Sequence, residues 1–147
     1  MPEEPLFAGA FMCERVLRET DGANSAIRIV DRVLSVGIGP EPPEVMPPLA
    51  LRLALVMGVY GHRAERTEYE ISVGVEPPVG EPSELNVYHV ATEYEGQPAW
   101  VVIELNFTAL HEGTYWFPVA VNGTRQTRIP LRIEYQRQVI ASADDPS

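Results

Sequence analysis

Alternation of apolar and polar side chains dominates the middle of the chain. Between Glu68 and Glu76, four apolar residues occupy every second position, with polar residues or glycine between them. A similar period of two runs from Ala99 to Phe107. Successive side chains of a β-strand point to opposite faces of its sheet, so each stretch predicts a strand with one buried face.

Two turn signals are expected to join neighbouring strands as hairpins. Within residues 114–135, two alternating stretches flank Asn122-Gly123, a pair that tolerates positive φ and strongly favours a hairpin turn. Near the start of the chain, Asp21-Gly22-Ala23-Asn24 separates residues 6–18 from residues 26–36. The sequence therefore predicts a hairpin at each of these turns.

Residues 49–60 carry mixed signals. They are rich in Leu and Ala, which favour helix, but apolar residues occupy every odd position from Leu49 to Val59. Because periodicity is the stronger signal, we expect a strand there. Proline-rich stretches at residues 39–43 and 77–82 predict loops, since proline cannot donate to a strand ladder.

These stretches together predict an all-β fold. Closely spaced strands with turn signals between them are typical of sandwiches and barrels, and about eight strands and no helix are expected. We predict an antiparallel two-sheet β-sandwich with immunoglobulin-like, Greek-key connections. The length of 147 residues suits one domain, so residues 1–147 should form a single β-sandwich domain, with residues 141–147 as a disordered tail.

A short motif favours a sandwich over a barrel. Gly113 is followed after one residue by Tyr115, which opens an alternating stretch. The motif resembles the tyrosine corner of immunoglobulin-like domains, in which the tyrosine hydroxyl bonds to upstream backbone, and it implies a structural role for Tyr115. The chain departs from the antibody pattern: it has a single cysteine, and Trp100 lies too close to Tyr115 to be the usual core tryptophan.

Two segments extend the resemblance. The stretch from Phe11 to Val16, which leads to Ile29-Val30-Asp31, and the hairpin at residues 113–135 are similar to an uncharacterised family of small bacterial all-β proteins. The resemblance implies an all-β domain and no activity that could be transferred to this chain.

The net negative charge of the chain argues against some classes of binding partner. The formal net charge is −10, with 21 acidic residues against 11 basic residues, all of them arginine. An acidic protein repels phosphate backbones and anionic lipid, so we expect neither nucleic acid nor a membrane as a partner. The acidic start of the chain does not resemble a secretory signal, and one cysteine cannot form an intrachain disulfide, so we expect a cytoplasmic protein.

Candidate catalytic and metal-binding residues form no recognisable constellation. His62, His89 and His111 are not spaced as metal ligands, and Cys13 has no partner thiol, so we expect no metal or other cofactor. His89 falls in the alternating apolar set that begins at Leu85, which predicts a buried structural histidine. No nucleophile elbow or phosphate-binding loop occurs, and we expect no catalytic residues.

Asp31 interrupts an apolar stretch. The apolar positions before and after it fall on opposite faces of a single strand. This conflict predicts a β-bulge near Asp31-Arg32, with a structural role for the aspartate.

Two predicted strands are apolar on both faces, which bears on the surfaces of the domain. Residues 6–13 and 49–60 are apolar on both faces, although a two-layer sandwich solvates one face of each strand. The second apolar face must be covered, either by the proline-rich loops or by a partner. Phe7 and Phe11 from the first stretch are candidate interface residues, as are Trp100 and Trp116, which lie opposite the core-facing residues of their own strands.

Three functions remain after these considerations. The favoured one is a non-catalytic protein-interaction or structural module, a self-associating homo-oligomer or the receptor of a protein partner, which uses an apolar sheet face or an exposed edge strand. The second is a ligand-binding module, for example for carbohydrate, with Trp100 and Trp116 as a stacking platform. An enzyme is the least favoured.

Overall fold

The fold is built from nine strands. The computed structural model describes residues 6–141 and contains no helix in that range, so no helix there could span a membrane. The strands are β1 (Leu6–Arg18), β2 (Asn24–Ile29), β3 (Arg32–Gly39), β4 (Leu49–Tyr60), β5 (Thr67–Val75), β6 (Ser83–Thr92), β7 (Pro98–Ala109), β8 (Gly113–Val121) and β9 (Thr124–Val139). Residues 142–147 of the predicted tail lie outside the described residues.

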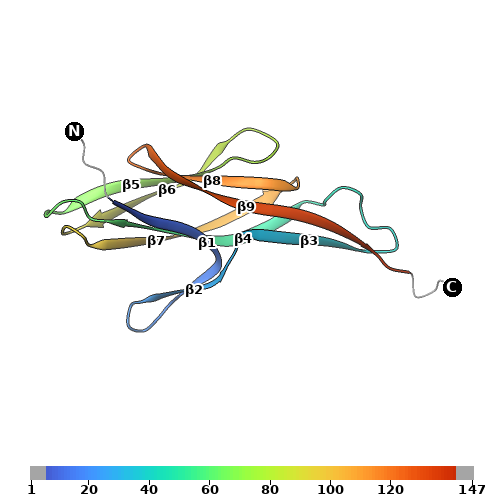
Figure 1. Ribbon diagram of the computed structural model, residues 1–147, viewed down its shortest axis with the longest axis horizontal. Helices are drawn as coiled ribbons and strands as arrows, with labels where there is room; N and C mark the ends of the chain where they lie inside the picture. Colours follow the sequence, from blue (N-terminus) through green and yellow to red (C-terminus); the bar gives the residue numbers. More distant parts are fainter. Residues whose placement is uncertain (1–5, 142–147) are drawn as a thin grey trace.

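The strands form two sheets that pack face to face (Figure 1). One sheet has the order β2-β1-β4-β7 and the other the order β3-β9-β8-β5-β6. Strands β1, β4 and β7 thus share one sheet and β5, β8 and β9 the other, which is the partition used by immunoglobulin-like sandwiches. The predicted all-β sandwich is confirmed. Every pairing is antiparallel except that of β3 with β9, which is parallel.

The core lies between the sheets and follows the predicted alternation. In β4 the inward residues Leu55, Met57 and Val59 are fully buried, which confirms that residues 49–60 form a strand. Opposite them, Phe117 of β8 is fully buried and packs edge-on against Phe107 of β7, with ring centroids 5.5 Å apart. Eighteen buried residues from the two sheets and Met46 from the β3–β4 loop form this single cluster.

The tyrosine corner is present at the connection from β7 to β8. The Tyr115 hydroxyl donates to the carbonyl oxygen of His111 at 2.7 Å, and the His111 amide lies 3.3 Å from the same hydroxyl. The ring of Tyr115 is buried in the core. Its predicted structural role follows from these contacts, because the hydroxyl fixes the chain where it leaves one sheet and enters the other.

The β8–β9 turn has the predicted chemistry. Asn122 and Gly123 have φ values of 50° and 82°, and Val121 pairs with Thr124, so the loop contains two residues. Positive φ at both loop positions is the signature of a type I′ hairpin turn. Asn122 also accepts a hydrogen bond from the Glu70 amide at 2.9 Å, which ties the turn to β5.

The predicted bulge at Asp31 is wrong. The chain instead leaves one sheet after β2 and enters the other at β3, which is why the apolar pattern changes face there. The Val30 amide still donates to Met12 of β1, whereas the Asp31 carbonyl already accepts from Arg132 of β9. The side chain of Asp31 is exposed. Residues 26–36 therefore supply two strands in place of one, which accounts for nine strands where about eight were expected.

The predicted burial of His89 is also wrong. A register shift between β5 and β6 pairs Val73 with Asn86 and Gly74 with Glu84, which leaves Leu85 as an extra residue. Such a bulge exchanges the faces of the strand beyond it. Tyr88 and Val90 therefore pack against the core, and His89 is exposed.

Candidate functional site

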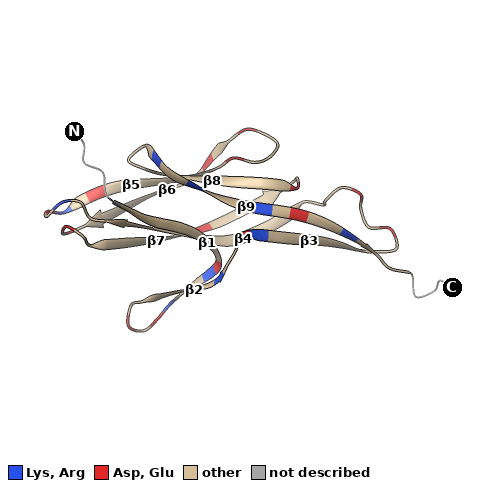
Figure 2. Ribbon diagram, viewed as in Figure 1, with Lys and Arg blue, Asp and Glu red and all other residues tan. Residues whose placement is uncertain are grey.

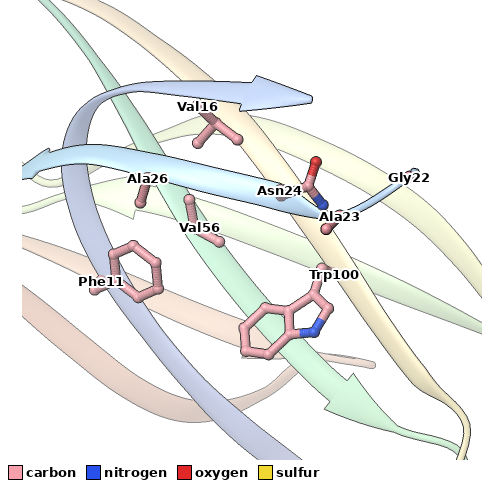
Figure 3. Close-up of a pocket in the computed structure, with 8 residues that line it drawn as sticks. All are labelled: Phe11, Val16, Gly22, Ala23, Asn24, Ala26, Val56 and Trp100. Carbon is pink, nitrogen blue, oxygen red and sulfur yellow. The ribbon is translucent and has the colours of Figure 1, made fainter. Parts of the chain in front are cut away.

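The second apolar face of the four-stranded sheet is covered in part by the chain itself. Strand β1 pairs with β4 as far as Cys13 and beyond it pairs only with β2. The β1–β2 hairpin thereby bends away from the sandwich (Figure 1), and its base lies over the outer face of β4 (Figure 3). Beneath it Cys13, Ala54 and Val56 form a small buried cluster. Neither a proline-rich loop nor a partner is needed at this cluster.

A cleft of about 430 Å³ remains between this hairpin and the sheet. Figure 3 shows Val56 and Trp100 on the sheet side and Val16 and Ala26 on the hairpin side, and Phe11 projects from β1 at the side of the cleft. The remaining lining residues are Gly22, Ala23 and Asn24. Asn24 and the indole N–H of Trp100 supply the polar side-chain groups of an otherwise apolar lining, so the cleft is suited to a ligand with an apolar or aromatic face.

Trp100 is held in a fixed position at this cleft. It pairs with Gly58 across β4 and β7, and a Cβ atom placed on Gly58 would lie 2.6 Å from the indole ring. The indole therefore lies directly on the glycine backbone, while 48% of the residue stays exposed. Gly58 was not among the candidate residues predicted from the sequence, although a glycine inside an apolar strand is the expected signal of such a close approach.

The other candidate interface residues lie elsewhere. Trp116 is on the outer face of the five-stranded sheet, where the guanidinium carbon of Arg128 lies 3.9 Å from its ring centroid. The two tryptophans thus face away from opposite sides of the sandwich and do not form one stacking platform. Phe7 packs against the main core, because a register shift between Phe7 and Gly9 separates its face from that of Phe11.

A different surface stands out at the edges of the sheets. The edge strands are β2 and β7 in one sheet and β3 and β6 in the other. Edge strands present unpaired N–H and C=O groups, and proteins normally protect them with charges, proline or bulges. Strand β6 has its bulge at Leu85 and carries Glu84 and His89, β7 begins at Pro98 and carries Glu104, and β2 is only six residues long.

Apart from Arg32 at its first position, strand β3 has none of these protections. Residues 33–39 contain no charged residue and no proline, and the register with β9 is continuous. Its outward side chains are aliphatic and exposed: Leu34 by 51%, Val36 by 42% and Ile38 by 61%. No residue between 6 and 141 pairs with the free edge of β3.

The parallel ladder shows which backbone groups of β3 are free. The carbonyls of Asp31 and Gly39 accept hydrogen bonds from the amides of Arg132 and Ile140, next to β9. Backbone groups alternate in direction along a strand, so the odd-numbered residues of β3 bond to β9. The even-numbered residues therefore direct their N–H and C=O groups to the free edge. They are the residues with exposed side chains: Arg32, Leu34, Val36 and Ile38.

The inner side of β3 is fixed. Gly37 leaves room for the Tyr135 ring, whose hydroxyl donates to the Pro43 carbonyl at 2.8 Å. Arg137 of β9 donates to the Pro42 carbonyl at 2.9 and 3.2 Å. These bonds attach the loop after β3 to β9, so the free edge belongs to a strand that is already ordered.

The predicted polar candidates are dispersed. His89 and His111 are exposed on β6 and on the β7–β8 corner, and the His62 amide lies 3.4 Å from the Tyr69 hydroxyl. No group of three or more His, Cys, Asp or Glu residues within residues 6–141 is placed to hold a metal ion. Burial raises the pKa of the Cys13 thiol, which lies under the β1–β2 hairpin.

Comparisons with known proteins give little similarity. No family model and no curated protein matches the chain. A solved structure of a β-glucosidase from Erythrobacter marinus matches 60% of this chain with 13% identity and a TM-score of 0.46. A β-glucosidase from Listeria innocua matches 74% with 10% identity and the same TM-score. This chain covers only 14% and 15% of those enzymes, and similarity of this degree does not bear on its function.

Proposed function

We propose that the protein is a non-catalytic interaction module that binds an extended segment of a protein along the free edge of β3. The observation that carries the proposal is the coincidence, at Leu34, Val36 and Ile38, of free backbone groups and exposed aliphatic side chains. In strand addition, backbone hydrogen bonds supply affinity and the alternate side chains supply specificity. Both components are available along β3.

The expected affinity is moderate. Full burial of an aliphatic side chain contributes about 1.5–3 kcal/mol, so three half-exposed residues would contribute about 1 kcal/mol each. Each backbone hydrogen bond adds about 0.5–1.5 kcal/mol net. Association costs about 4 kcal/mol or more in lost motion. With the six backbone groups of Leu34, Val36 and Ile38 bonded at about 1 kcal/mol each, the sum is about −5 kcal/mol, a dissociation constant on the order of 10⁻⁴ M.

A peptide tests the proposal without a second folded domain. We expect a synthetic peptide with the sequence of residues 31–40 to shift the amide NMR signals of β3 and to slow hydrogen exchange at Leu34, Val36 and Ile38. Val36→Lys should weaken binding at least tenfold, because a charged side chain would replace an aliphatic one in the row that packs beside the side chains of the added strand. Val87→Lys is the matched control, since Val87 is 45% exposed on β6, the other edge of the same sheet.

Two results would contradict this proposal. One is equal loss of peptide binding in Val36→Lys and Val87→Lys. The other is a set of shifted signals that excludes β3.

Trp100 supports a second candidate, a ligand-binding module for carbohydrate or another flat ligand. Its indole lies flat against Gly58 and is half exposed beside an open cleft, and a tryptophan face can stack on a sugar ring. Trp116→Phe leaves Trp100 as the single tryptophan, whose emission can be excited selectively. A saturable emission change with a sugar, absent in Trp100→Phe, would support this candidate, and unchanged emission across a panel of sugars would contradict it.

A further inference from the structure

The two ends of β3 differ in charge. Arg32 stands at its start, with Asp31 directly before it and Arg28 at the end of β2, whereas Glu41 and Glu44 follow the end of β3 in the loop toward β4 (Figure 2). Arg28 is paired with Glu14 at 3.4 Å. Arg32, Glu41 and Glu44 have no ion-pair partner among the residues that the structure describes. Between the ends, residues 33–39 are uncharged.

Such a strand is complementary to itself when two copies run antiparallel. The acidic end of one strand, with Glu41 and Glu44, then lies beside Arg32 at the start of the other, at both ends of the contact, and the two pairs of glutamates are kept apart. A parallel arrangement would instead place arginine beside arginine and glutamate beside glutamate. Antiparallel pairing of identical strands also creates a two-fold axis, which is the commonest symmetry of homo-oligomers.

The free backbone groups select the register. A hydrogen-bonded antiparallel pair exchanges an N–H and a C=O in each direction, and the even-numbered residues of β3 carry the free groups. If the axis passes beside Ser35, Leu34 pairs with Val36 of the second copy, and Arg32 pairs with Ile38. All four even-numbered residues then find partners, and the aliphatic side chains form one continuous row.

We infer that the segment that binds β3 is β3 of a second copy of this chain, paired antiparallel about a two-fold axis beside Ser35. This inference rests on the proposed function and names its partner. The two five-stranded sheets become one continuous sheet. Its new outer edges are the two β6 strands, which carry Glu84, His89 and the bulge at Leu85. Addition of further copies is therefore opposed, and the assembly closes as a dimer.

Charge exchange between the strand ends tests the arrangement. In sedimentation velocity over a range of protein concentrations, wild type should populate a dimer. Arg32→Glu should raise its dissociation constant at least tenfold, because each glutamate would face Glu41 and Glu44 of the other copy. Glu41→Arg with Glu44→Arg should have the same effect. A mixture of these two variants should dimerise again, since every end contact in the mixed dimer joins opposite charges.

The outcomes separate this inference from the proposed function. Recovery of dimerisation in the mixture supports the antiparallel two-fold pair. A dimer that neither charge variant weakens overturns the inferred arrangement. A monomeric wild type that still binds the peptide of residues 31–40 overturns the second copy as partner and leaves strand addition standing. A monomeric wild type that does not bind the peptide overturns both.

Discussion

Strands β3 and β6 are the two edges of one sheet, and they meet solvent in opposite ways. Strand β6 carries Glu84 and His89 and is interrupted by a bulge at Leu85. Strand β3 is continuous, uncharged from residue 33 to residue 39 and aliphatic on its outer face. A strand edge that is not protected against pairing is a site for pairing. Because two edges of one sheet differ in this way, the open edge of β3 depends on the residues of that strand and does not follow from the fold.

The largest expected effect comes from removing one amide of the free edge. Val36→Pro deletes an N–H that points away from β9, so the fold should survive while the dimer dissociates about 100-fold more readily, equivalent to about 2.7 kcal/mol. Ser35→Pro deletes an N–H that bonds to β9 and should lower the free energy of unfolding by about 3 kcal/mol. Thermal unfolding and sedimentation of the two variants measure this difference. Equal loss of stability in both would contradict the assignment of even-numbered residues to the free edge.

A smaller effect is expected where β3 is attached to the sandwich. A Cβ atom at Gly37 would lie 2.2 Å from the Tyr135 hydroxyl, so Gly37→Ala should lower the free energy of unfolding by about 1–3 kcal/mol. Gly39→Ala is a poor control because Gly39 has a φ of 150°. Ser35→Ala, on the same face of β3, is the better one, and chemical denaturation compares the two. A cost in Gly37→Ala no larger than that in Ser35→Ala would show that Tyr135 does not position the edge.

The smallest effect is expected from removing the protecting residues of β6, the other edge of the same sheet. Glu84→Val combined with His89→Val removes the charge and the imidazole from β6 but keeps its bulge. Species larger than a dimer should then appear, with about a tenfold gain in association between β6 edges, equivalent to about 1.4 kcal/mol. Light scattering over a concentration series measures this gain. An unchanged dimer would indicate that the bulge alone protects β6, and deletion of Leu85 in the same background would test that directly.

Local patterns in the sequence predicted most of the fold. Alternation identified the strands around Ile71, Ile103 and Phe117, and Asn122-Gly123 identified a turn whose φ values match it. Tyr115 identified the corner between the sheets. Each of these signals is local, because a side chain's face depends on its own strand and a turn's φ values depend on its own residues.

The errors came from properties that depend on neighbouring strands. A residue's face changes wherever a bulge occurs, so His89 was assigned to the wrong face, and Phe7 was grouped with Phe11 although it packs against the core. The change of sheet at Asp31 resembles a bulge in the sequence because both exchange faces. Only the pairing partners distinguish them.

The candidate site was predicted in kind but not in position. An edge strand was among the surfaces considered, yet Leu34, Val36 and Ile38 alternate in the same way in an edge strand and in a central one. Which strand is an edge depends on the order of the whole sheet. The absence of charge and proline from residues 33–39 was the available signal, since natural edges normally carry one or the other.

Amide hydrogen exchange along β3, measured by NMR at several protein concentrations, tests directly whether the even-numbered residues of β3 form the edge that pairs in the dimer. The amides of Ser35 and Gly37 should be protected at every concentration, because they bond to β9. Those of Leu34, Val36 and Ile38 should exchange rapidly in dilute solution and become protected as the dimer forms. Rapid exchange of these three amides at all concentrations, or concentration-dependent protection that appears on β6 instead, would contradict the assignment of β3 as the binding edge.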